Sequence, residues 1–193
     1  KVDVSASLAS KGYPFLKSLA NSVQESAHMV IRDKVDVLYI LKEESSQSIR
    51  IATSLGSKMP MYCTGVGKGI LAFMDEDYMS VYYRYQKLKK RTKKTITNKK
   101  KLNLELASIR KSYISIDNEE FADHLYCVAT PIFDSNEDPI AAISVSGLKD
   151  RMISKKNVIY DKVLESGKRI TKEIGGEYPS IINNQTIGVE NVI

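Results

Sequence analysis

The chain has 193 residues, enough for one domain with a sizeable core, and its 29 lysines and arginines exceed its 23 aspartates and glutamates, for a formal net charge of +6. No apolar run reaches the roughly 18 residues of a membrane span and no basic-then-apolar leader is present, so we expect a cytoplasmic protein without a membrane segment. The two cysteines are too few for a disulfide framework and lack zinc-ligand spacing, so we expect neither metal nor cofactor.

The positive charge is concentrated in one segment, Lys87–Lys101, which holds nine basic residues and no acid. With those nine taken from the 29, the remainder carries 20 basic residues against 23 acids, a net charge of −3. No aromatic residue lies inside the segment, which favours a solvated helix end and loop. The alternative is a patch that binds nucleic acid or a partner protein.

The first third of the chain reads as one helix followed by short strands. Apolar residues at helical spacing predict an amphipathic helix over 12–27. Three β-rich runs, at 28–32, 35–41 and 48–54, are separated by polar turns and predict an antiparallel meander. A glycine-rich turn then leads directly into a helix near residue 65.

The remaining elements mix helices with hairpins. We expect them at the following places: a helix over 75–86 capped by Asp75, a helix from about 102 to 111, a strand over 113–117, a hairpin of 125–133 and 139–148 with a loop at 134–138, and a last helix over 154–174 stopped by Gly175-Gly176. Alternating βα units are absent from this pattern. The predicted fold class is therefore α+β, on one antiparallel sheet.

The glycine-rich turn is the most informative motif. Thr64 can cap the helix that follows, and glycines let other groups approach its first N–H groups, as in sites for a carboxylate or phosphate. A Walker loop requires Ser or Thr where Gly69 stands, and a dinucleotide fingerprint requires glycine where Ile70 stands, so neither nucleotide motif is present. The alternative is an ordinary tight turn into a core helix.

Strand alternation isolates a second polar feature. Ser144 and Ser146 share one face of the predicted strand 139–148, and Cys127 lies on one face of its neighbour with Leu125 and Ala129. If these faces meet the glycine turn, they form a small polar pocket. Otherwise the two serines satisfy each other at the sheet surface.

Catalytic motifs are weak. The two histidines, His28 and His124, have no recognisable nucleophile nearby, and we interpret His28 as a half-buried structural residue. We therefore expect no enzyme. The alternative is a thiol-based reductase that uses Cys63 and Cys127, which would require both thiols to be exposed and reactive.

Several motifs, taken in order, resemble the effector-binding domain of IclR-type bacterial transcriptional regulators. They lie at 59–73, 91–102, 115–120, 127–134 and 141–147, and the resemblance runs from about residue 10 to 176. It implies a GAF-like domain at 1–176 with a tail at 177–193. It also implies a homodimer or homotetramer that contacts DNA only through an N-terminal winged helix-turn-helix domain absent from this sequence.

The resemblance further implies that the domain senses a small metabolite. Its ligand groups would come from these positions: Gly65, Val66, Asp117, Cys127, Ser144 and Ser146. We expect a ligand carboxylate to accept hydrogen bonds from the N–H groups and hydroxyls. An ionised Asp117 would repel that carboxylate unless the ligand places donors between them, which favours a hydroxy, keto or sugar acid.

Overall fold

The computed structural model describes residues 2–48 and 53–180. One antiparallel sheet runs through it, in the strand order β3-β2-β1-β6-β5-β4. Its strands are β1 (Ser26–Asp33), β2 (Asp36–Glu43), β3 (Lys58–Pro60), β4 (Ser115–Asn118), β5 (Leu125–Phe133) and β6 (Pro139–Leu148). The helices are α1 (Val2–Val23), α2 (Gly65–Leu71), α3 (Glu76–Tyr85), α4 (Lys99–Ser112), α5 (Lys149–Ser154) and α6 (Lys156–Glu173), with a 3₁₀ turn η1 (Met61–Cys63). The α+β class with one antiparallel sheet is confirmed.

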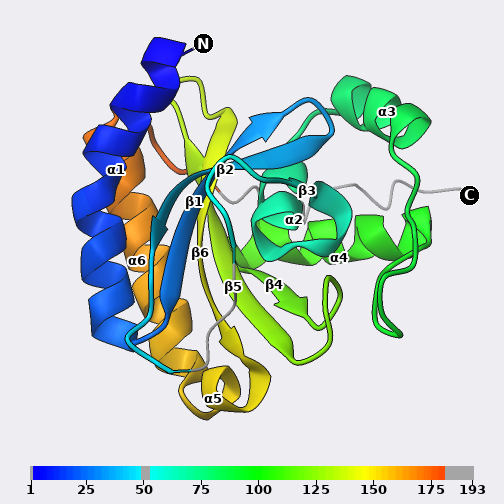
Figure 1. Ribbon diagram of the computed structural model, residues 1–193. Helices are drawn as coiled ribbons and strands as arrows, with labels where there is room; N and C mark the ends of the chain where they lie inside the picture. Colours follow the sequence, from blue (N-terminus) through cyan, green and yellow to red (C-terminus); the bar gives the residue numbers. More distant parts are fainter. Residues whose placement is uncertain (1, 49–52, 181–193) are drawn as a thin grey trace, which may run out of the picture.

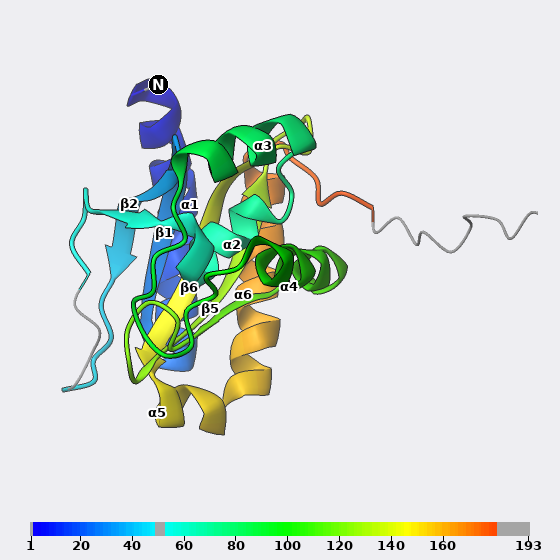
Figure 2. The ribbon, with the colours of Figure 1, turned by 90° about the vertical axis from the view of Figure 1, so that its right-hand side faces the viewer.

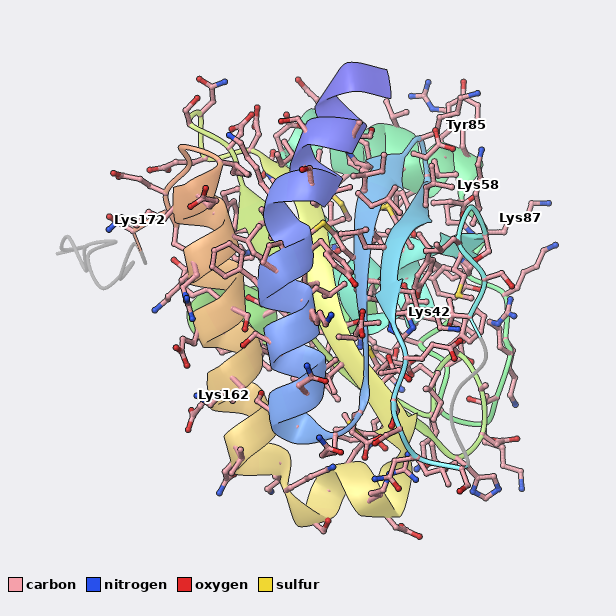
Figure 3. The ribbon with its side chains drawn as sticks, turned by 60° about the vertical axis from the view of Figure 1, so that its left-hand side comes forward. Lys42, Lys58, Tyr85, Lys87, Lys162 and Lys172 are labelled. Atoms are coloured by element: carbon pink, nitrogen blue, oxygen red, sulfur yellow. The ribbon has the colours of Figure 1, made fainter. Side chains whose placement is uncertain are left out.

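Helices cover both faces of the sheet. Helices α1 and α6 lie side by side on one face, and α2 and α4 lie on the other, as Figures 1 and 2 show from two directions. On the outer side of α6, Lys162 and Lys172 point away from the sheet (Figure 3). The apolar side chains of α1 and α6 meet the inward face of the strands, and this core includes Leu16, Ile143 and Ile170.

The alternation of β6 divides its side chains between these two layers. Ile143 and Val145 belong to the α1–α6 core, whereas Ala142 belongs to the core under α2. Ser144 therefore faces α2, since side chains alternate along a strand. The predicted hairpin of β5 and β6 is confirmed, and in its loop Asp134 Oδ1 accepts hydrogen bonds from the N–H groups of Asn136 and Asp138.

The first helix begins earlier and ends earlier than predicted. It spans Val2–Val23 and continues through Pro14, and Ala27 lies in β1. Gln24 ends the helix with a φ of 56°. A Cβ on Gly12 would lie 2.2 Å from Met29 Cε, so glycine here leaves room for the end of the Met29 side chain of β1. Tertiary packing therefore overrides the local Gly and Pro signals that favoured a later start.

Three other strand and helix predictions need correction. Of the expected strand over 48–54, residues 49–52 lie outside the described residues and 53–54 form no strand; the strand paired with β2 is Lys58–Pro60. The last helix is two helices, α5 and α6, with Lys155 between them in a non-helical conformation. Tyr113 is not a strand residue but the left-handed cap of α4, with a φ of 58°.

The segment after α6 returns to the sheet. The Tyr178 hydroxyl lies 2.7 Å from Pro131 O and 3.0 Å from Thr130 Oγ1, and its ring packs against Tyr113 and Phe133. Among the described residues, no helix is long and apolar enough to cross a membrane.

Candidate functional site

The start of α2 is built around a capping threonine and close glycines. Thr64 Oγ1 accepts a hydrogen bond from Gly67 N at 3.2 Å, and the Thr64 hydroxyl donates to Pro60 O at 2.9 Å. A Cβ on Gly67 would lie 2.3 Å from Met61 Cα, so only glycine fits this turn. The N–H groups of Gly65 and Val66 lie in the first turn, where an α-helix supplies no partner of its own.

Three polar side chains lie opposite this turn on neighbouring strands. Asp117 of β4 pairs in register with Cys127 of β5, and Cys127 pairs with Ser146 of β6. The turn rests directly on this row, since a Cβ on Gly65 would lie 3.1 Å from Cys127 Sγ and 3.5 Å from Asp117 N. Glycine at this position thus brings the backbone of α2 against the sheet.

A small pocket of about 50 Å³ lies where the turn meets the row. It is lined by Tyr39, Thr53, Met59, Thr64, Gly65, Val66, Asp117, Phe121, Leu125, Cys127 and Ser146. Five of the six expected ligand residues therefore line one pocket. The sixth, Ser144, is buried two residues before Ser146 in β6, opposite His28 of β1 and Ala129 of β5.

Asp117 is the carboxylate of the pocket. Its side chain is 1% exposed, and Oδ1 accepts hydrogen bonds from Glu120 N at 2.7 Å and Phe121 N at 3.3 Å. Burial raises the pKa of Asp117 to about 7, and the negative charge of Glu120 raises it further. The two hydrogen bonds from the backbone lower it, but they do not outweigh burial. Near neutral pH the carboxyl therefore exists in both forms, which amends the expectation of a fully ionised group.

Both cysteine thiols are buried and stay protonated near neutral pH. Burial raises the pKa of Cys63 to about 12 and that of Cys127 to about 11. A reactive thiol needs the opposite, a lowered pKa and access to solvent. The thiol reductase alternative is therefore not favoured. Cys127 is a buried residue that lines the pocket, and its side chain interacts with Ser144 and Ser146.

Lys68 does not reach the pocket. Its buried ammonium lies 2.5 Å from Glu120 Oε1 and 3.0 Å from Glu105 Oε1 of α4. Burial opposes the charge of Lys68, but the two carboxylates outweigh burial and raise its pKa, so the ammonium stays charged. The lysine thereby joins α2, α4 and the loop after Asp117.

The basic segment supports that same loop. The hydroxyls of Thr92 and Thr95 donate to the carbonyl oxygens of Glu119 and Glu120 at 2.6 and 2.7 Å. The guanidinium of Arg91 lies 4.1 Å from the centre of the Phe121 ring, which lines the pocket. A patch at Lys87–Lys101 that binds nucleic acid or a partner protein stays an untested alternative.

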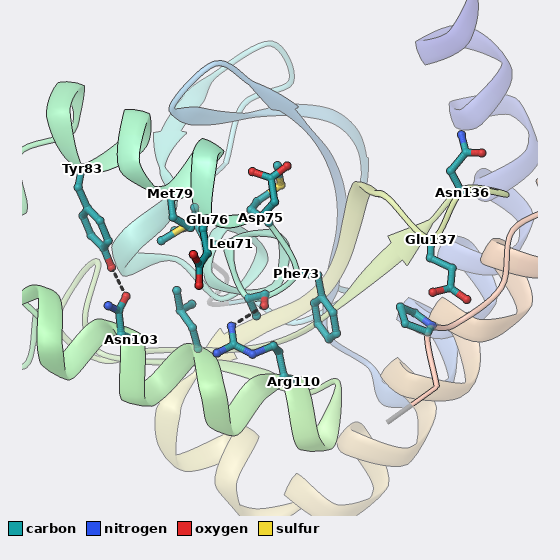
Figure 4. Close-up of a pocket in the computed structure, with 14 residues that line it drawn as sticks. Leu71, Phe73, Asp75, Glu76, Met79, Tyr83, Asn103, Arg110, Asn136 and Glu137 are labelled. Atoms are coloured by element: carbon teal, nitrogen blue, oxygen red, sulfur yellow. Dashed lines mark hydrogen bonds between the residues drawn. The ribbon is translucent and has the colours of Figure 1, made fainter. Parts of the chain in front are cut away.

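A second, larger hollow of about 680 Å³ lies between α3 and α4 (Figure 4). There the Tyr83 hydroxyl donates to Asn103 Oδ1 at 2.5 Å, and Arg110 donates to Ala72 O at 2.8 Å. None of the expected ligand residues lines this hollow. Its polar side chains, including Glu76, Asn103 and Arg110, are exposed to solvent, so size alone does not make it the better candidate.

Sequence reasoning missed two residues that line the pocket, Tyr39 and Phe121, and it missed the full burial of His28 on the same side of the sheet. The expected half-buried His28 is instead 1% exposed, and its ring packs edge-on against Tyr39 at 5.6 Å between centres. Alternation along 35–41 could have placed Tyr39 on the same face as Val37. Among the described residues, no group of three or more His, Cys, Asp or Glu side chains is arranged to hold a metal ion.

The chain is thus an α+β domain with a small polar pocket between a capped glycine turn and an antiparallel sheet. The family model described as "Bacterial transcriptional regulator IclR C-terminal" matches residues 2–172. The chain is 30% identical over 167 residues to the transcriptional repressor IclR of Escherichia coli, covering 85% of this chain and 61% of that protein. It thus spans somewhat less than two thirds of that relative.

Solved structures of IclR-family proteins have the same fold as this chain. The Thermotoga maritima IclR structure is 33% identical with a TM-score of 0.76, over 85% of this chain and 68% of that one. The C-terminal domain of E. coli KdgR is 26% identical with a TM-score of 0.79, over 87% of this chain and 98% of that one. The chain belongs to the IclR family of bacterial transcriptional regulators and corresponds to the C-terminal, effector-binding domain.

Proposed function

We propose that the pocket binds a small carboxylate metabolite, a hydroxy, keto or sugar acid, as the effector of an IclR-type regulator. One observation carries the proposal: the open first turn of α2 meets the buried row of Asp117, Cys127 and Ser146 around a single cavity. Backbone N–H groups and hydroxyls that converge on one small, largely buried space suit a carboxylate.

The carboxylate would accept hydrogen bonds from the N–H groups of Gly65 and Val66 and from the hydroxyl of Ser146. Ser144, one position inward on the same face, would bind the far side of the ligand or hold Cys127 in place. Hydrogen bonds to a charged group contribute roughly 1.5–3 kcal/mol each. A few of them suffice for a metabolite sensor with a micromolar to millimolar Kd.

Asp117 would select among acids. Its protonated form donates a hydrogen bond to a ligand carbonyl or carboxylate, and its ionised form accepts one from a ligand hydroxyl. A plain fatty acid offers neither a hydroxyl nor a keto oxygen beside its carboxylate. The preference would therefore be for acids with a second oxygen near the first.

Effector binding would be transmitted through the loop that Asp117 holds. Its carboxyl fixes the N–H groups of Glu120 and Phe121, and Glu120 pairs with Lys68 of α2. A ligand that shifts Asp117 would shift this loop and bias a DNA-binding domain in a homodimer or homotetramer, with a coupling of about 1–3 kcal/mol. Such a regulator would work in the cytoplasm and contact DNA through the N-terminal domain of the family.

A thermal-shift screen with small hydroxy, keto and sugar acids tests the proposal. We expect at least one acid to raise the Tm of the wild type, because a ligand that binds only the folded state stabilises it. The shift should disappear in Ser146→Ala and Asp117→Ala. It should persist in Ser154→Ala, which removes a hydroxyl at the end of α5, outside the pocket. A hit that stabilises all four proteins equally would refute the pocket.

A further inference from the structure

His28 is a buried polar side chain without a hydrogen-bond partner. It is 1% exposed, and within the described part of the chain neither Nδ1 nor Nε2 has a partner. A buried imidazole left unpaired costs stability, so such a group calls for an explanation. The position of His28 in the fold supplies an explanation.

His28 lies on the same side of the sheet as the pocket, behind Tyr39 and outside the residues that line the cavity. It pairs in register with Ser144, and Ser26 two residues earlier pairs with Ser146. Tyr39, whose ring packs edge-on against the His28 ring, lines the pocket. The polar layer that begins at Asp117 therefore continues through Ser146 and Ser144 to His28 on β1.

An ion pair, formed by Lys42 and Glu44, lies beside the His28 end of this layer. Lys42 pairs in register with His28, and its ammonium lies 2.8 Å from Thr53 O, a residue of the pocket wall, and 2.7 Å from Glu44. An imidazole N–H beside an ammonium suits an oxygen that accepts hydrogen bonds. One strand spacing and two residues of rise separate the Cα atoms of His28 and Ser146 by about 8 Å, the reach of a short-chain diacid.

We propose that His28 is a further specificity-determining residue of the effector pocket, where it binds a second, distal carboxylate of the effector. This rests on the proposed function and narrows it: the effector is a short dicarboxylic acid with a hydroxyl or keto oxygen beside one carboxylate. The proximal carboxylate lies at Gly65, Val66 and Ser146. The distal carboxylate passes Tyr39 and accepts a hydrogen bond from His28.

Two matched acids test this inference by calorimetry. Both 2-oxoglutarate and 2-oxopentanoate have five carbons and a 2-oxo acid end, and only the first has a distal carboxylate. The wild type should bind 2-oxoglutarate about tenfold or more tightly than 2-oxopentanoate, as expected for a hydrogen bond to a charged group. In His28→Leu the ratio should fall close to one, and His28→Asn should retain part of it.

Thermal unfolding of the free protein separates a binding role from a structural one. If His28 is kept for binding, His28→Leu removes an unpaired buried group and should raise the Tm by about 2–4 °C. A drop in Tm would indicate that the imidazole stabilises the fold and would count against the inference. His124→Asn is the matched control: His124, the second histidine, is exposed and should affect neither Tm nor the ratio.

The outcomes distinguish this inference from the function on which it rests. If Ser146→Ala weakens both acids while the ratio is the same in wild type and His28→Leu, the inference is wrong and the proposed function stands. If neither acid binds the wild type at millimolar concentration, the inference is overturned, and the broader acid screen decides the proposed function. If both acids bind but Ser146→Ala has no effect, both proposals fail.

Discussion

The two faces of the sheet treat buried polar groups differently. On the α1–α6 side, the buried carboxylate of Glu25 pairs with Arg151 at 2.5 Å and with Lys155 at 3.0 Å. On the α2 side, several buried polar atoms have no partner among the described residues. They belong to His28, Tyr82, Ser115 and Glu120.

Under the proposed function, the unpaired groups of the α2 side are kept for binding, whereas the paired groups of the α1–α6 side stabilise the fold. The α1–α6 core consists of closely packed apolar side chains. A substitution there should therefore change the free energy of unfolding. The α2 side contains a buried ion-pair network around Lys68 and several unpaired polar atoms, and each unpaired atom costs stability in the free protein. Substitutions on the two faces should therefore affect different measurements.

The largest effect should come from the buried lysine of the α2 side. Lys68→Ala leaves the Glu120 carboxylate buried without its cation and should lower the free energy of unfolding by about 3–5 kcal/mol in denaturant titration. Lys162→Ala removes an exposed lysine that pairs with Glu165 and should cost less than about 1 kcal/mol. Equal costs would mean that the Lys68 network is no more important than a surface pair.

The next effect is a pH dependence at Asp117. Because its pKa is raised from 3.8 to about 7, the folded state binds this proton more tightly, and stability falls as pH rises from about 4 to about 7. Asp117→Asn mimics the protonated form at every pH. Relative to wild type, it should gain about 2–3 kcal/mol between pH 5 and pH 8, measured by denaturant titration at each pH.

The comparison with Asn at position 117 is needed because His28 acts in the opposite direction. Burial lowers the pKa of His28 to about 4, so the unfolded state binds that proton more tightly, and stability rises from pH 4 to about 6.5. His28 is present in both proteins, so its contribution cancels in the difference. A difference that stays constant from pH 5 to pH 8 would contradict the raised pKa of Asp117.

A smaller effect should mark the opposite face. Ile170→Val removes one buried methyl group from the α1–α6 core and should lower the free energy of unfolding by about 0.5–1.5 kcal/mol. Effector affinity should not change, because Ile170 lies across the sheet from the pocket. A loss of affinity comparable to that of Ser146→Ala would show that the two faces are not independent.

The sequence predicts the fold best where local pattern and packing agree. The β5–β6 hairpin consists of two apolar, β-rich runs around a polar five-residue loop, and the capping residues Thr64 and Asp75 have the chemistry that a helix start requires. The edge strand Lys58–Pro60 could not be predicted, since three residues ending in proline carry little strand signal. The helix also runs through Gly12 and Pro14, two residues whose local preferences oppose a helix interior.

The same distinction applies to the pocket. Gly65, Asp117, Cys127 and Ser146 could be predicted because turn chemistry and strand alternation identify them individually. His28 could not, because its relation to Ser144 arises from the pairing of β1 with β6, more than 100 residues apart in the chain. Long-range pairing of this kind leaves no periodicity in a single sequence.

Calorimetric titration of Ser146→Ala with an acid identified by the thermal screen tests the central claim most directly. The account predicts that the free protein unfolds with nearly the wild-type free energy while its affinity for the acid falls about 10- to 100-fold, since the lost hydroxyl bonds a charged ligand. Ile170→Val, measured alongside, should bind as the wild type does. Wild-type affinity in Ser146→Ala would contradict the assignment of the α2 face as the effector site.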